Sequence, residues 1–223
     1  MAIESDFKKW SDYRRMPVPE MQETARHLHE ELSRRRSVRE FSSEPVPREV
    51  IESCLRTAAT APSGANRQPW HFVVIENPEV KKQIRAAAEQ EERAFYGGRA
   101  PEEWLRALRP FATTPEKPFL ETAPVLIAVF AQSHRTEADQ SRSRNYYINE
   151  SVGLATGFLV SCLHLSGLAC LVHTPSPMGF LNQILDRPKG ERAFLLLIVG
   201  YPAEDVKVPT LSRRPFAEIV SFR

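Results

Sequence analysis

Four stretches of the chain are predicted to be helical, the first two because apolar residues recur at helical spacing. In the first stretch Leu28 and Leu32 share one face, and in the second Ile51 and Leu55 do the same. Pro47 and Pro78 mark the starts of the second and third stretches. The turn at residues 61–64, with its proline and glycine, ends the second stretch, and Gly97-Gly98 ends the third. The four helices are therefore predicted over residues 20–34, from Pro47 to the turn at residues 61–64, from residue 78 to about Tyr96, and over residues 145–165.

Continuous or alternating apolar runs predict four strands between these helices. The run at residues 123–131 reads APVLIAVFA and has no polar position, which is typical of a strand buried on both faces. The strands are predicted over residues 70–75, 123–131, near 169–173 and 193–199. Residues 1–19, with aromatic residues among charges, are expected to form an extended arm, and residues 208–223 are again polar and basic.

The stretch at residues 145–165 differs from the other helical stretches because it is apolar on nearly every side. Gly153, Ala155 and Gly157 would let another element approach it closely. Helices of this kind lie in a core or in an interface between subunits.

Composition narrows the class of protein. With 223 residues, 42% hydrophobic and 26% charged, the chain can form one sizeable α/β domain. A net charge of +2 gives no reason to expect nucleic acid or a membrane surface as a partner. Residues 1–9 lack an apolar segment typical of a secretory signal, and no apolar run approaches the roughly 20 residues of a membrane span. We therefore expect a single cytoplasmic domain over residues 1–223.

Several common kinds of site are disfavoured. The three cysteines, Cys54, Cys162 and Cys170, are scattered and lie among apolar residues, so they favour neither a disulfide framework nor a catalytic role. The six histidines show no spacing that supports metal binding. Neither G-x-G-x-x-G nor the P-loop pattern is present, which argues against a dinucleotide-binding or P-loop enzyme.

Arginines cluster directly after the first predicted helix, in the sequence RRRSVR at residues 34–39. The planar guanidinium group suits bidentate phosphate binding and keeps its charge. A solvated basic helix end is the simpler interpretation of the spacing alone. A nucleic-acid patch is less favoured, because no aromatic residue is interleaved.

A second candidate is the segment TAPSGANRQPW at residues 60–70, between the second helix and the first strand. Its small side chains would let a flat ring approach the backbone. Taken alone, this segment is better explained as an ordinary helix-to-strand loop.

Together these segments resemble the nitroreductase superfamily, through R-R-S-V-R-x-F, A-P-S-G-A-x-x-x-P-W, V-G-Y-P at residues 199–202 and R-R-P at residues 213–215. The resemblance runs from about Leu32 to Ile219. It implies a three-layer α+β sandwich of the α/β/α kind, an intertwined homodimer and bound FMN. It assigns FMN binding to Arg35, Arg36, Ser37, Val38, Arg39, Pro62, Ser63, Gly64, Val172, His173, Thr174 and Arg213.

Within that superfamily the chain is similar to the iodotyrosine deiodinase branch. The similarity lies in residues 89–96 (EQEERAFY) and in Lys117 after a tryptophan-containing insert. It implies a lid at about residues 89–118, in which Glu92, Tyr96 and Lys117 hold the zwitterion of a halotyrosine. Glu92 and Tyr96 are four residues apart and so share a helix face. Without the resemblance, Glu92 would be interpreted as one of a run of surface charges and Lys117 as part of a mobile loop.

The resemblance also assigns the reaction. The Thr174 hydroxyl would bond flavin N5 as the catalytic contact, and a donor there favours one-electron steps over hydride transfer. The Ala65 backbone N–H would bond the substrate's phenolate oxygen. Segment 63–65 would come from the other subunit. Val172 and His173 depart from the expected threonines, and His173 is expected to be structural.

We therefore expect an FMN-dependent reductive dehalogenase of halotyrosines with an unidentified electron donor, either a reductase or NAD(P)H. A general NAD(P)H-dependent nitro or quinone reductase of the same fold is the alternative enzyme, and it would not need the zwitterion clamp. A non-catalytic flavin or nucleic-acid binder is the alternative outside enzymes.

Overall fold

The computed structural model describes residues 7–137 and 139–223. The chain divides into two compact units, and the boundary in sequence lies between Arg34 and Arg35. The first unit carries α1 (Val18–Arg34), an amphipathic helix with no buried residue, on which Arg26 forms ion pairs with Glu23 and Glu30. The helix begins before the predicted residue 20, so positions 18 and 19 of the expected arm are helical. The rest of that arm is non-helical over residues 7–17, and its first six residues lie outside the described part.

The second unit is built on a four-stranded sheet with the order β1-β2-β6-β5. Its strands are β1 (Trp70–Ile75), β2 (Val125–Gln132), β6 (Glu191–Gly200) and β5 (Ala169–His173), and every neighbouring pair is antiparallel. All four predicted strands are confirmed, with ends that differ by at most two residues. Seven of the eight residues of β2 are buried, so the prediction of a strand covered on both faces is also confirmed.

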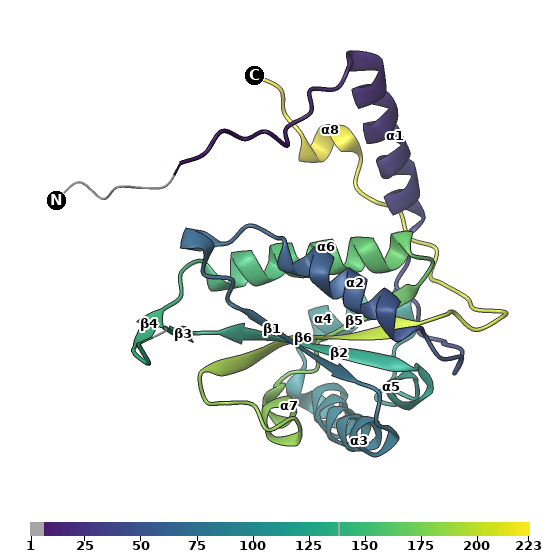
Figure 1. The fold of residues 1–223 in the computed structure, drawn as a ribbon. Coiled ribbons are helices and arrows are strands. Elements are labelled where there is room, and N and C mark those ends of the chain that lie inside the picture. Colours follow the sequence, from purple (N-terminus) through teal and green to yellow (C-terminus); the bar gives the residue numbers. More distant parts are fainter. Residues whose placement is uncertain (1–6, 138) are drawn as a thin grey trace. The chain divides into compact units, whose positions relative to one another are not determined.

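Helices cover both faces of the sheet (Figure 1). On one face lie α2 (Arg48–Ala59) and α6 (Ile148–Leu165), and on the other lie α3 (Pro78–Ala94), α5 (Phe119–Thr122) and α7 (Gly179–Ile184). Alternate residues of β2 point into separate cores: Ile127 belongs to the core under α2 and α6, and Leu126 belongs to the core on the other side. The predicted three-layer α+β sandwich is confirmed.

The start of α3 follows its sequence signal closely. The Asn77 side chain accepts hydrogen bonds from the backbone N–H groups of Glu79 and Val80, and Pro78 occupies the first turn. Further along, the buried Lys81 donates to the backbone oxygens of Glu121 and Ala123 at 3.0 and 2.8 Å. These bonds fix α5, and with it the chain that leads into β2.

The end of α3 was predicted at about Tyr96, and the structure differs there. The α-helix ends at Ala94 and continues as a wider π-helical turn, η2 (Phe95–Arg99), which includes Gly97 and Gly98. Gly98, at φ 136°, adopts a conformation that favours glycine and ends the turn. The excursion continues through α4 (Glu102–Leu108) and η3 (Arg109–Phe111) before the chain reaches α5.

Helix α6 begins at Ile148, three residues later than predicted, because Tyr147 has a left-handed backbone with φ 48°. One side of α6 is buried through Val152, Leu159 and neighbouring residues, while Leu154 and Phe158 remain 48% and 40% exposed. By length and composition alone α6 could cross a membrane, but its buried side packs on the sheet. Nothing in the described chain lies within 4 Å of where a side chain at Gly153 or Gly157 would begin.

Four short elements complete the described part of the unit. The strands β3 (His134–Thr136) and β4 (Arg142–Arg144) form a hairpin after β2, and η1 (Gly64–Asn66) follows α2. The polar C-terminal stretch predicted over residues 208–223 contains one helical turn, α8 (Phe216–Ile219).

Candidate active site

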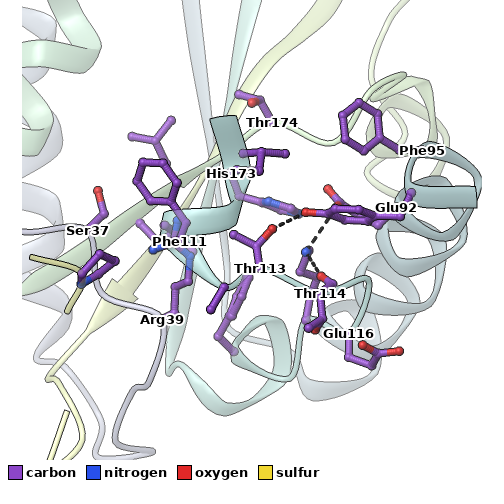
Figure 2. A pocket seen from close by; sticks show the side chains of 18 of the residues that line it. Ser37, Arg39, Glu92, Phe95, Phe111, Thr113, Thr114, Glu116, His173 and Thr174 are labelled. Carbon is purple, nitrogen blue, oxygen red and sulfur yellow. Dashed lines mark hydrogen bonds and ion pairs between the residues drawn. The ribbon is translucent and has the colours of Figure 1, made fainter. Parts of the chain in front are cut away.

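A cavity of about 710 Å³ opens beside the end of β5, on the side of the sheet that faces α3. Residues from five separate stretches line it: the arginine segment after α1, the end of α3 with η2, the chain from α4 to α5, the end of β5, and residues 207–209. Figure 2 shows Ser37 and Arg39 on one side of the pocket and Glu92 and Phe95 on the opposite side. The cavity therefore has two chemically different ends.

At the first end the arginine segment runs along the edge of the sheet. Ser37 forms a bridge with Cys170 of β5, and the Val38 N–H donates to the Cys170 carbonyl at 3.4 Å. The Val38 side chain is buried in the core, so any ligand contact of this residue must come from its backbone. Ser37 and Arg39 are left to line the cavity.

Three arginines of this segment have no acidic partner in the described part of the chain. Within residues 7–137 and 139–223, no ion pair joins Arg35, Arg36 or Arg39 to a carboxylate. Arg36 donates instead to the Pro209 carbonyl, and the Arg39 guanidinium lies over the Phe111 ring at 5.6 Å. Burial lowers the pKa of Arg39 below its ordinary value. A cluster of cations without counter-charges is suited to a phosphate.

At the second end the three residues predicted to bind a zwitterion come together. Lys117 Nζ lies 3.1 Å from Glu92 Oε2, and the two side chains are only 6% and 14% exposed. The same ammonium lies 5.7 Å from the centre of the Tyr96 ring, and the Tyr96 hydroxyl bonds Thr113. Glu92 comes from α3, Tyr96 from η2 and Lys117 from the chain before α5.

Hydrogen bonds and ion pairs hold the segment between Tyr96 and Lys117 near both of its ends. The Glu89 carboxylate accepts the Lys117 N–H at 2.8 Å and Arg85 Nε at 2.7 Å. Burial tends to raise the pKa of Glu89, but these hydrogen bonds prevail and hold it below its ordinary value. At the other end Arg99 bonds the Ser176 carbonyl and pairs with Glu91. These bonds hold the segment beside the cavity, which several of its residues line.

His173 and Thr174 lie between the two ends, where β5 stops (Figure 2). His173 is 8% exposed and meets the Phe119 ring edge-on at 5.8 Å. Burial, with the nearby charges of Lys117 and Arg39, lowers the pKa of His173 to about 3, so the imidazole is neutral at physiological pH. Its Nε2 is buried and has no hydrogen-bond partner among the described residues. Val172 and Thr174 also line the cavity.

The remaining predicted contacts do not line this cavity. Pro62, Ser63, Gly64 and Ala65 follow α2 and pack at the start of α6, where the Gly64 N–H donates to Ser151 Oγ at 3.4 Å. Arg35 and Arg36 directly precede Ser37, which lines the cavity. Arg213 is exposed in the C-terminal stretch. One chain therefore assembles the arginine end and the lid end of the predicted site, but not the segment at residues 62–65.

The loop at residues 62–68 is nevertheless held in an unusual conformation. Ala65, Asn66 and Gln68 all have positive φ, near 50°. The Ser63 hydroxyl accepts the Gln68 N–H at 2.9 Å, and Arg67 bonds Asn145 at 3.1 Å and pairs with Glu137 at 2.9 Å. Several non-glycine residues with left-handed backbones are costly, and such strain is typical of functional loops.

Sequence reasoning missed several lining residues, of which Phe111, Thr113 and Phe119 are the most informative. Phe111 and Phe119 resemble ordinary apolar residues of a helical insert. No spacing distinguished them, because their role depends on how the insert folds over the sheet edge.

Comparisons with known proteins agree with the fold and the site described above. The nitroreductase family model matches residues 32–201, so the chain belongs to the nitroreductase family. Iodotyrosine deiodinase of Haliscomenobacter hydrossis is 51% identical over 201 residues, which are 90% of each chain. Iodotyrosine deiodinase 1 of Homo sapiens is 42% identical over 205 residues, which are 92% of this chain and 71% of that protein.

Solved structures support the same placement. The crystal structure of oxidized iodotyrosine deiodinase bound to FMN and 3-iodo-L-tyrosine matches with a TM-score of 0.74 and 33% identity, over 87% of this chain and 100% of that one. A BluB-like flavoprotein from Clostridium difficile matches with a TM-score of 0.66 at 21% identity, which supports the fold alone.

Proposed function

We propose that this protein is an FMN-dependent reductive dehalogenase that removes halide from iodotyrosine and related halotyrosines. The observation that carries the proposal is the buried Glu92–Lys117 pair with Tyr96, within one cavity that also contains Ser37 and Arg39. The relatives at 51% and 42% identity, both iodotyrosine deiodinases, support the same substrate class.

The arginine end fits the phosphate of FMN, because Arg35, Arg36 and Arg39 have no acidic partners among the described residues and Ser37 adds a hydroxyl. FMN, when bound, supplies the two electrons of the reaction. The Thr174 hydroxyl, which lines the cavity just after β5, would donate a hydrogen bond to flavin N5. Val172 and His173 would shape the wall beside the ring, and Arg213 would reach the phosphate from the C-terminal stretch.

The lid end selects the substrate. Glu92 would accept the substrate's ammonium, Lys117 would bind its carboxylate, and the Tyr96 hydroxyl would add a hydrogen bond beside them. A substrate zwitterion can replace the Glu92–Lys117 pair without leaving either charge unpaired, whereas an uncharged phenol cannot. Binding would also close residues 89–118 over the cavity and exclude water.

The segment at residues 62–65 would complete the site of a second subunit in an intertwined homodimer. Two observations support this arrangement: residues 62–65 do not line the cavity of their own chain, and Leu154 and Phe158 are exposed on α6. Pro62, Ser63 and Gly64 would lie beside the flavin ring, and the Ala65 N–H would donate to the phenolate oxygen and favour its ionised form.

The reaction replaces a carbon–halogen bond with a carbon–hydrogen bond. Two electrons and one proton enter, and tyrosine and a halide ion leave. No nucleophile is needed, which agrees with the burial of Cys54 and Cys170, where burial raises the pKa of both thiols. The electron donor is either a reductase or NAD(P)H, the protein acts in the cytoplasm, and neither nucleic acid nor a membrane is a partner.

The proposal is tested by anaerobic turnover of the reduced, FMN-loaded protein. We expect stoichiometric release of iodide and tyrosine from 3-iodotyrosine, and slow or no release of iodide from 2-iodophenol, which lacks the head group. Faster reduction of nitroaromatics and quinones than of 3-iodotyrosine would instead support a general nitro or quinone reductase. A colourless protein that does not take up FMN would support a non-catalytic role.

A further inference from the structure

Arg67 joins the loop at residues 62–68 to the hairpin that follows β2. Its Nε donates to Asn145 Oδ1 at 3.1 Å, one terminal nitrogen pairs with Glu137 at 2.9 Å, and the other bonds the Ser143 hydroxyl. The Arg67 side chain is 15% exposed, so these bonds form largely out of water. A planar guanidinium that donates in three directions to fixed acceptors holds its own backbone in one place.

The buried acceptor among these partners is itself firmly held. Asn145 is 2% exposed, its side-chain amide donates to the Gln132 carbonyl at 2.8 Å, and its N–H donates to the Ser133 carbonyl at 3.0 Å. Gln132 is the last residue of β2, an interior strand of the sheet. Through Asn145, Arg67 is therefore anchored to the central sheet.

Two positions before Arg67, Ala65 presents the backbone donor that the proposed function uses. Ala65 is exposed, has φ 49°, and its N–H has no hydrogen-bond partner among the described residues. A left-handed backbone is unfavourable for alanine, so it persists only where the surrounding structure holds it. The Gly64 N–H contributes one bond to Ser151 Oγ, but at 3.4 Å this bond is long. The charged bonds of Arg67 are the stronger anchor of the loop.

We propose that Arg67 is a positioning residue for the reaction: by holding the loop, it fixes the direction of the Ala65 N–H and so sets how strongly the site binds the phenolate oxygen of the substrate. A hydrogen bond weakens steeply when the donor is not aimed at the acceptor. Arg67 acts through Ala65 and needs no contact with the substrate. This inference rests on the proposed function, because it takes the Ala65 N–H as the donor to the phenolate.

A pair of ligands isolates this effect. 3-Iodotyrosine and 3-iodophenylalanine share the iodine, the ring and the head group, and only the first carries the phenol oxygen. Each is titrated against the fluorescence of bound FMN in the FMN-loaded protein. We expect the natural protein to bind 3-iodotyrosine at least about tenfold more tightly than 3-iodophenylalanine, as is typical of a hydrogen bond to a charged group.

Arg67→Met keeps the apolar stem of the side chain and removes the guanidinium. In this variant the ratio of the two affinities should fall below about threefold, because the N–H is no longer held in one direction. A general loss of structure or of subunit contacts would weaken both ligands alike and leave the ratio unchanged. The ratio therefore separates positioning of the Ala65 N–H from a merely structural role.

Glu137→Ala is a second variant that leaves Arg67 in place, and Arg135→Ala is its matched control. Glu137 pairs with Arg67 at 2.9 Å, whereas Arg135, on the same hairpin, lies 3.9 Å from the same carboxylate group. Glu137→Ala should lower the affinity ratio at least about twofold, and Arg135→Ala should leave it unchanged.

An unchanged ratio in Arg67→Met or in Glu137→Ala, or an equal loss in Arg135→Ala, would overturn the inference while leaving the proposed function standing. Equal binding of the two ligands by the natural protein would instead contradict the contact proposed at Ala65 itself.

Discussion

Lys117 and Glu92 form an ion pair of 3.1 Å in the wall of the cavity, and both side chains are largely shielded from water. The pair joins residues 25 positions apart in sequence and faces the cavity together with the Tyr96 ring. Two buried, opposite charges of this kind are balanced only by each other or by a ligand that carries both charges.

Replacement of Glu92 by glutamine should weaken binding of 3-iodotyrosine by roughly one to two orders of magnitude, because a charge-assisted hydrogen bond to the ammonium is lost. FMN binding should change little, since Glu92 lies at the opposite end of the cavity. The measurement is a fluorescence titration of the FMN-loaded variant. Glu91→Gln is the control, because Glu91 pairs with Arg99 at the rim; equal losses in both variants would contradict the assigned role of Glu92.

The buried His173 should make the protein sensitive to acid. Its pKa falls from an ordinary value of 6.5 to about 3 in the folded state, mainly through burial. The unfolded chain therefore binds the extra proton between these values, so the free energy of unfolding should fall as the pH drops from 6.5 toward 3. His173→Thr should flatten this dependence in denaturant unfolding measured across that range. His29, which is exposed on α1, provides a control substitution.

Gly64 should not tolerate a side chain. A Cβ atom there would lie 2.7 Å from Tyr147 Cδ2 and 3.2 Å from the Tyr146 carbonyl oxygen. We expect Gly64→Ala to destabilise the protein by about 1–3 kcal/mol, as is usual for overpacking, and to weaken FMN binding if this loop borders the flavin. Thermal unfolding and FMN titration measure the two effects. Gly179→Ala is the matched control, since nothing lies within 4 Å of its Cβ position.

The exposed apolar side of α6 should form the homodimer. Phe158→Glu places a charge on this side and should shift the protein toward monomer in light scattering after size-exclusion chromatography. FMN affinity should fall in parallel, because residues 62–65 would no longer reach the second subunit's site. A dimer that survives this substitution, or a monomer that still binds FMN with full affinity, would contradict the shared site. Val74→Glu on β1 provides a control at another exposed apolar position.

The sequence was sufficient for the strands and the three layers because their signals are local. An apolar run such as residues 123–131 or an Asn-Pro helix start has one physical explanation, and the structure agrees with it. The later start of α6 and the π-helical end of α3 depended on the left-handed Tyr147 and on Gly98, whose conformations no periodicity reveals.

The candidate site was predictable only in part for the same reason. Glu92 and Tyr96 share a helix face by spacing, but their meeting with Lys117 depends on a 20-residue excursion through η2, α4 and η3. The contact of Phe111 with Arg39 could not be predicted, since it joins an apolar residue of that excursion to a separate segment. Chemistry that depends on tertiary folding was therefore visible only through the family resemblance.

Recognition of the amino-acid head group is the central claim, and it is tested most directly by titrating the fluorescence of bound FMN with 3-iodotyrosine and, separately, with 2-iodophenol. We expect saturable quenching by 3-iodotyrosine with an affinity at least about a hundredfold higher than that for 2-iodophenol, because only the amino acid engages both Glu92 and Lys117. Equal affinities for the two compounds would contradict the clamp and favour a general reductase.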